Sequence, residues 1–258
     1  MTLHNKLLAT AFAVSVAAAY GAGATPAQAN AGGIEATARA AAKAKPAYDA
    51  PVELDVNFVF HIDNNLPEQD VFVARTPGAD QVYRPNAGER DLDRPLYAAA
   101  KKVKRDPFDD AAVGPWPKGK ALGLTLRDWL QATGAGRYTC RDGEGHIEVE
   151  FAGLVPDGVY TMWHYFVAWP PTDPFIGAYS LPLGSRDGVQ SIFTADAKGD
   201  ARFERRFRPC LQLTGEHLAA GLAIAWHSDG KTYGARPGDL TTVSHIQLYS
   251  RLPQRAGM

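Results

Sequence analysis

Polar and apolar residues alternate over several short segments of the chain, which is the pattern of β-strands with one buried face. In residues 52–62, VELDVNFVFHI, every even position is apolar and most odd positions are polar. Two shorter segments follow at 70–75 and 81–85. After Gly136 come seven more: GRYTC, HIEVEFAGL, GVYTMWHYFVA, VQSIFTA, ARFERRF, GLAIAWH and TVSHIQLYSRL. The pattern predicts a chain built mainly from strands.

Short polar turns separate these predicted strands, for example Pro156-Asp157-Gly158 and Ser228-Asp229-Gly230. Many short strands joined by tight turns favour an all-β fold, an antiparallel β-sandwich of jelly-roll or immunoglobulin-like type. One short helix is predicted near 125–133. Thr125 and Asp128 have the spacing of a capping box, and Gly134 provides a stop.

The N-terminus predicts export from the cytoplasm. A lysine, an apolar run over 7–19 and Ala-Gln-Ala at 27–29 are the parts of a signal peptide covering residues 1–29. We expect a flexible segment at 30–50 and a single domain over 51–252. That domain would include a long irregular segment at 86–123, rich in proline, glycine and charge, and a tail would follow at 253–258. No transmembrane span is expected after signal cleavage, so the mature protein would be secreted or periplasmic.

Charge and cysteine content narrow the possible partners. Lys and Arg number 27 against 28 Asp and Glu, a net charge of −1, which does not point to a nucleic-acid partner. The two cysteines, Cys140 and Cys210, both follow the leader. In an oxidising compartment they predict one disulfide.

Six histidines remain after the leader, and none makes a His-x-His pair or a His-Glu-x-x-His motif. A metal site would therefore have to be assembled across strands. His164, His227 and His245 lie in or beside aromatic strands, and three imidazoles would suit copper or zinc. Strand parity puts His227 and His245 away from the aliphatic residues, so they could meet on one outer face if their strands are neighbours.

Aromatic residues and loop polar groups offer a second kind of site. Trp169 and Phe175 follow an aromatic strand, in a loop where exposed rings often serve recognition of sugars, peptides or surfaces. Asp229 and Tyr233 lie in another loop, AWHSDGKTYG, at 225–234. These four residues are our candidate ligand-binding set.

Serine chemistry is a third reading of the same stretch. Ser228 to Lys231 has the Ser-x-x-Lys spelling of acyl enzymes, but Asp-Gly between two strands favours a turn. Ser228, His227 and Asp239 could spell a triad. Because adjacent residues of an extended chain point to opposite sides, His227 is badly placed to serve Ser228.

The blocks GLVPDGVYTMWHYFVAWPP and GLAIAWHSDGKTYGARPGDLTTVSHIQLY are similar to a pattern in uncharacterised exported bacterial β-sandwich proteins. The resemblance covers residues 136–252 and implies a fold and an extracytoplasmic location, without an activity. Our leading hypothesis is a non-catalytic binding or accessory protein whose partner is a small molecule, a glycan or a protein. The alternatives are a copper or zinc protein, such as a small metallo-oxidoreductase, and a hydrolase.

Overall fold

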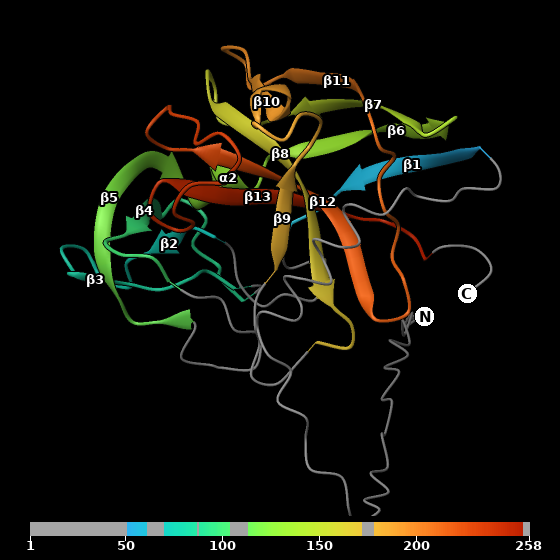
Figure 1. The fold of residues 1–258 in the computed structure, drawn as a ribbon. Helices are drawn as coiled ribbons and strands as arrows, with labels where there is room; N and C mark the ends of the chain where they lie inside the picture. Colours follow the sequence, from blue (N-terminus) through green and yellow to red (C-terminus); the bar gives the residue numbers. More distant parts are fainter. Residues whose placement is uncertain (1–50, 61–69, 87, 104–112, 172–177, 255–258) are drawn as a thin grey trace, which may run out of the picture.

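The protein is described from a computed structural model, which covers residues 51–60, 70–86, 88–103, 113–171 and 178–254. It is an all-β sandwich of antiparallel sheets, as predicted, with a small third sheet at one end (Figure 1). Sheet A has the order β1-β6-β7-β11. Its strands are β1 (Val52–Phe58), β6 (Thr133–Arg141), β7 (Glu144–Ala152) and β11 (Ala201–Phe207).

Sheet B has the order β10-β8-β12-β13, and β9 also pairs with β8. Its strands are β8 (Val159–Ala168), β9 (Tyr179–Pro182), β10 (Ile192–Thr194), β12 (Leu218–His227) and β13 (Ser244–Arg251). Sheet C, of order β2-β4-β5-β3, contains β2 (Phe72–Val73), β3 (Gln81–Val82), β4 (Pro95–Ala99) and β5 (Trp116–Thr125).

The main core lies between sheets A and B. Sheet A contributes its inward positions, and sheet B contributes the residues of β8, β12 and β13 that face them. Large aromatic members of this core include Tyr138, Phe151 and Phe203 from sheet A and Tyr160, Phe166 and Trp226 from sheet B. Burial of these side chains supplies the main favourable free energy of folding.

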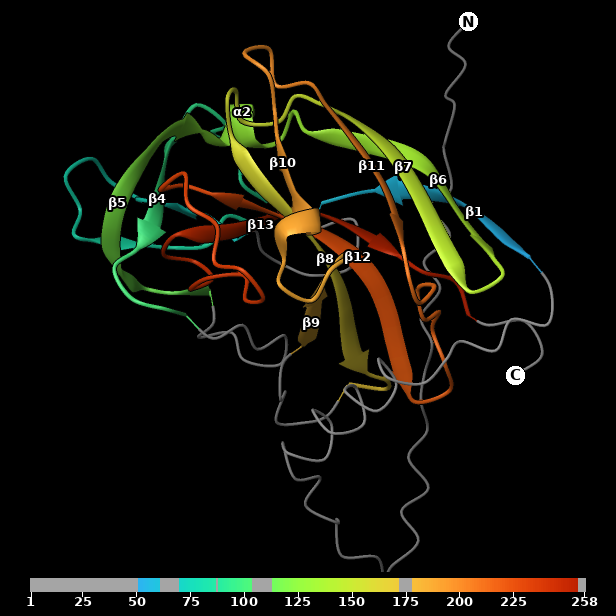
Figure 2. The same ribbon diagram turned by 45° about the horizontal axis from the view of Figure 1, so that its top comes forward.

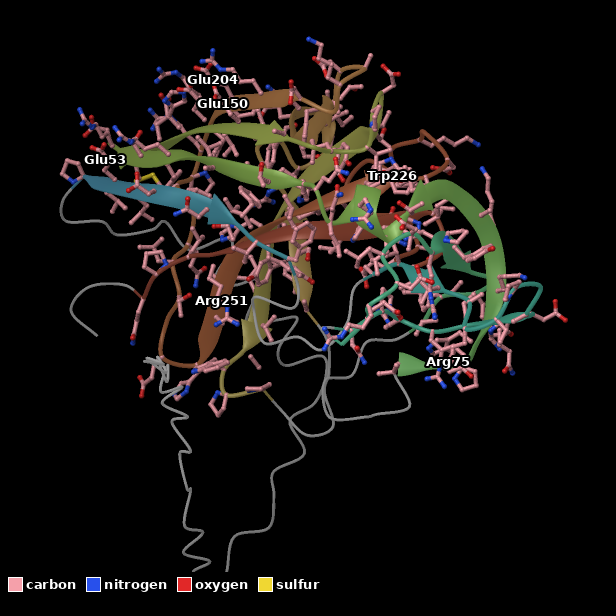
Figure 3. All side chains as sticks on the ribbon, turned by 180° about the vertical axis from the view of Figure 1, so that it is seen from behind. Glu53, Arg75, Glu150, Glu204, Trp226 and Arg251 are labelled. Atoms are coloured by element: carbon pink, nitrogen blue, oxygen red, sulfur yellow. A yellow bond between two sulfur atoms is a disulfide. The ribbon has the colours of Figure 1, made fainter. Side chains whose placement is uncertain are left out.

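Sheet A presents its other face to solvent, and that face is charged. Figure 3 shows Glu53, Glu150 and Glu204 projecting from it, away from sheet B. At the β11 edge, the Arg205 guanidinium donates to the carbonyls of Gln190 and Ile192 at 2.8 and 3.0 Å, and so ties sheet A to sheet B. Figure 2 shows β10 and β11 next to each other at this edge. Gln190 belongs to a 3-10 turn, η3 (Val189–Ser191), which precedes β10.

The short strands expected at 70–75 and 81–85 are confirmed as β2 and β3 of sheet C. The segment 86–123, which we expected to be irregular, contains β4 and most of β5 in its described residues. Pro117, Gly119 and Gly123 weaken the strand signal of β5, yet the strand pairs with β4 on one side and β3 on the other. Gly119 has a steric reason to be there, since a Cβ at this position would lie 2.6 Å from the Ala99 carbonyl. The glycine thus reflects a close approach of two strands.

The helix and the disulfide both form as predicted. Helix α2 (Leu126–Trp129) has the Thr125–Asp128 capping box, although it ends earlier than 133 because β6 begins there. Cys140 and Cys210 form a disulfide with a Cα–Cα distance of 5.8 Å, linking β6 to the chain after β11. Within the described residues, no helix has the length and apolarity needed to cross a membrane.

Candidate functional site

Polar side chains gather at the end of sheet B where β12 stops at His227 and β13 starts at Ser244. The chain between them, residues 228–243, is called the connecting loop below. It lies beside sheet C, because the Ala99 N–H donates to the Thr241 carbonyl at 2.9 Å and the Val103 N–H donates to its hydroxyl at 3.0 Å. In Figure 1 this end of sheet B is seen next to β4 and β2.

On the outer face of sheet B, a chain of hydrogen bonds passes through His227, whose exposed fraction is 2%. The Trp163 indole donates to the Thr161 hydroxyl at 2.7 Å, and that hydroxyl lies 2.8 Å from His227 Nε2. On the other side, His227 Nδ1 lies 2.9 Å from the Ser244 hydroxyl, which donates to the Pro237 carbonyl. The donors therefore run in one direction, which assigns the proton of a neutral imidazole to Nδ1.

On the opposite face of sheet B, His245 is fully buried, with an exposed fraction of 0%. Its Nδ1 lies 3.0 Å from the Asp70 carbonyl, and its Nε2 lies 3.3 Å from the Ser228 hydroxyl. Asp70 is itself held in place. Its carboxylate accepts from Arg84 Nη1 at 2.8 Å and from the Ile246 N–H at 3.3 Å.

His227 and His245 therefore lie on opposite faces of the sheet, where we had expected one shared face. A β-bulge causes the difference. Ile224 pairs with Leu248 and Ala225 pairs with Ile246, so Gln247 is an extra residue in β13 that shifts the parity. His245 then pairs with Trp226 of the core, while His227 pairs with Ser244.

The connecting loop presents an ordered polar surface. The Tyr233 hydroxyl donates to the Asp229 carboxylate at 2.5 Å, and the Lys231 N–H donates to the other carboxylate oxygen at 3.1 Å. The Tyr233 ring lies 5.8 Å from the His227 ring and is 37% exposed. Gly238 allows this position, since a Cβ there would lie 2.7 Å from the tyrosine ring.

Burial sets the charge state of the histidines. Desolvation lowers the pKa of His227 to about 4 and also lowers the pKa of His245, although the Asp70 carbonyl opposes the second shift. Both imidazoles are therefore neutral near pH 7. On the surface, the hydrogen bond to Asp229 raises the pKa of Tyr233 to about 12, so the phenol keeps its proton.

The three histidines proposed as metal ligands are not brought together. His164 pairs with Leu222, on the core side, and its Nε2 lies 3.1 Å from the Gln212 carbonyl. The partner of His227 in β8 is Val159. Val159 lies five positions before His164, which corresponds to about 17 Å along a strand. Among the described residues, no group of three or more His, Cys, Asp or Glu is placed to hold a metal ion.

The predicted ligand-binding residues also separate. Trp169 is 54% exposed and follows Ala168, which pairs with Leu218 at the far end of β12. Ala168 lies nine positions along β8 from Val159, so Trp169 lies about 30 Å from the connecting loop that carries Asp229 and Tyr233. Phe175 lies outside the described residues.

Four buried polar residues that surround the histidines were not predicted: Thr161, Ser244, Asp70 and Arg84. Thr161 carried a usable signal, because it alternates with the core residues Tyr160 and Met162 in β8. Asp70 and Arg84 carried none, since their pairing depends on where sheet C docks.

The sequence could spell a triad of Ser228, His227 and Asp239, and the structure pairs these side chains differently. His227 is hydrogen-bonded to Ser244, while Ser228 lies against His245.

A scan of protein-family models, a search of curated proteins and a search of solved structures find no match to this chain.

Proposed function

We propose that the protein is an extracytoplasmic binding protein that uses the connecting loop to bind a small hydroxyl-rich ligand, such as a glycan. The observation that carries the proposal is the Tyr233–Asp229 pair. The Tyr233 ring is partly exposed, and its hydroxyl donates to the Asp229 carboxylate at 2.5 Å, which fixes the two side chains to each other. A surface pair that is already ordered loses little side-chain entropy when a ligand binds.

The chemistry of the pair suits hydroxyl groups. Each Asp229 oxygen accepts one hydrogen bond from the loop and has a further lone pair for a ligand hydroxyl. Lys231 and Arg236 are exposed in the same loop and can supply donors to a ligand. The tyrosine ring adds an apolar face on which a sugar ring can lie.

The scaffold behind the loop supports the same role. Ser228 N–H donates to the Val243 carbonyl at 2.9 Å, and Ser244 joins the loop to His227 through Pro237. These buried contacts hold both ends of the loop. The Cys140–Cys210 disulfide supports export, because disulfides persist in oxidising compartments.

The test is a printed glycan array probed with the disulfide-bonded mature protein, followed by calorimetric titration of the strongest glycan. Tyr233→Ala and Asp229→Asn should each weaken binding at least tenfold while the thermal unfolding midpoint stays close to that of the wild type. Trp169→Ala is the matched control, an exposed aromatic about 30 Å away that should leave affinity unchanged.

Two results would overturn the proposal. One is an absence of binding to every printed glycan by the wild-type protein. The other is binding that survives Tyr233→Ala and is lost in Trp169→Ala, which would move the site to the opposite end of sheet B.

A further inference from the structure

Ser228, the first residue of the connecting loop, lies between two acceptors. Its Oγ is 3.3 Å from His245 Nε2 and 3.3 Å from the Val243 carbonyl. A hydroxyl has one hydrogen, so it can turn from the carbonyl to the imidazole without moving the backbone. A serine beside an imidazole nitrogen is the basic arrangement of an activated nucleophile.

The orientation of His245 supports this role. A backbone carbonyl can only accept, so the 3.0 Å contact with the Asp70 carbonyl fixes the His245 proton on Nδ1. The Nε2 lone pair is then directed at Ser228. Because Arg84 and the Ile246 N–H both bind the Asp70 carboxylate, the orienting carbonyl is itself held in place. The serine, imidazole and carbonyl thus follow the order of a catalytic triad, with a carbonyl as its third member.

Access to the pair is one-sided. Ser228 is partly exposed, whereas His245 is completely buried beneath it. An electrophile can reach Oγ from the loop surface, and the imidazole can take the serine proton. The buried imidazole is poorly placed to pass that proton to a leaving group, so the pair suits leaving groups that depart as stable anions.

The backbone limits the expected rate. The Ser228 N–H donates to the Val243 carbonyl at 2.9 Å and is not free to stabilise an oxyanion. Loss of one oxyanion donor lowers kcat by about a hundredfold to a thousandfold in enzymes that use one. Slow acylation by activated esters is therefore expected, rather than hydrolysis of ordinary amides.

We propose that Ser228 is a nucleophile toward activated acyl and phosphonyl groups, with His245 as its general base. In acylation by an aryl ester, Oγ forms a bond to the carbonyl carbon and the carbon–oxygen bond to the aryl group breaks. The phenolate leaves, and the serine proton moves to His245 Nε2. This activity goes beyond ligand binding at Tyr233 and does not depend on it.

The experiment treats the full disulfide-bonded chain with a fluorophosphonate probe, which loses fluoride when serine attacks phosphorus. Intact-mass and peptide analysis should find one adduct, on Ser228. Ser228→Ala should abolish labelling, whereas Ser185→Ala, at a partly exposed serine in another loop, should leave it unchanged. His245→Asn keeps a donor for the Asp70 carbonyl but lacks the Nε2 lone pair, so labelling should slow at least tenfold.

The labelling rates of Ser228 and Ser185 in the wild-type protein test the proposal even if His245→Asn does not fold. A labelling rate at Ser228 no faster than that at Ser185 would overturn the proposal. With p-nitrophenyl acetate, we expect a burst of about one equivalent of p-nitrophenolate and an acetyl group on Ser228. Glycan binding that survives Ser228→Ala while labelling is lost would separate this proposal from the binding function.

Discussion

The outer face of sheet A and the end of sheet B at the connecting loop are both rich in polar groups. Those of sheet A are exposed to solvent, whereas those of sheet B are buried. On sheet A the charges are exposed and paired in the open. Arg137, whose side chain is 64% exposed, lies 3.1 Å from Glu53, and Arg202 lies 2.6 Å from Glu148. At the end of sheet B, Thr161, His227, Ser244 and His245 are buried, and each has a hydrogen-bond partner.

The contrast shows where polar groups matter for the structure. An exposed group that loses its partner is solvated by water, whereas a buried one keeps the full penalty of desolvation. We therefore expect substitutions at the end of sheet B to be costly and substitutions on sheet A to be tolerated.

The largest effect is expected at the buried ion pair behind His245. Asp70→Ala leaves the Arg84 guanidinium buried without its carboxylate and should lower the free energy of unfolding by about 3 to 5 kcal/mol. Urea unfolding of the oxidised protein measures the loss. Replacing both partners, as Asp70→Leu with Arg84→Met, should cost less than Asp70→Ala alone. A loss below about 1 kcal/mol for Asp70→Ala would show that this end of sheet B is no more sensitive than sheet A.

Acid should give the next largest effect, through the buried histidines. The pKa values of His164 and His227 are about 4 in the folded protein, while unfolded histidine titrates near 6.5, so only the unfolded chain takes up protons between these values. Stability present above pH 6.5 should fall toward pH 4 by up to about 1.4 kcal/mol per pH unit for each histidine. Urea unfolding at a series of pH values gives the slope, which His227→Gln should reduce. A stability that stays constant from pH 7 to pH 5 would contradict the assignment of neutral buried imidazoles.

The smallest effect is expected on sheet A. Arg137→Ala removes ion pairs with Glu53 and Asp55 and should cost less than about 1 kcal/mol, with a smaller loss in high salt. Unfolding in low and high salt tests this. A salt-independent loss of several kcal/mol would mean that the charged face contributes to stability as strongly as the buried network.

Most of the fold could be predicted because its determinants are local. Alternation located the strands of sheets A and B other than β9, and Thr125 with Asp128 fixed the start of the helix. In sheet C, β2 and β3 lie in segments that were predicted as strands, whereas β4 and β5 were missed. β4 is short and begins with proline, and β5 contains proline and glycine, so pairing with neighbours decides their conformation.

The site could be predicted only in part. The sequence pointed to Asp229 and Tyr233 as ligand-binding residues and to His227 as a metal ligand, and the structure places these three close together. It could not pair Ser228 with His245, because that contact depends on the bulge at Gln247. The sequence also could not show that Trp169 and Tyr233 lie at opposite ends of sheet B, because this depends on how β8 pairs with β12.

The bulge also governs which strand pairings the chain can reach while it folds. The Gln247 side chain accepts from the Tyr160 hydroxyl at 2.8 Å and donates to the Trp129 carbonyl at 3.0 Å. Sliding β13 along β12 by two residues would preserve inside and outside for most of the strand, but it would remove this amide from both partners. Gln247 therefore fixes the register of β13 against β12. A slipped and aggregation-prone pairing of β13 would lose both of these hydrogen bonds.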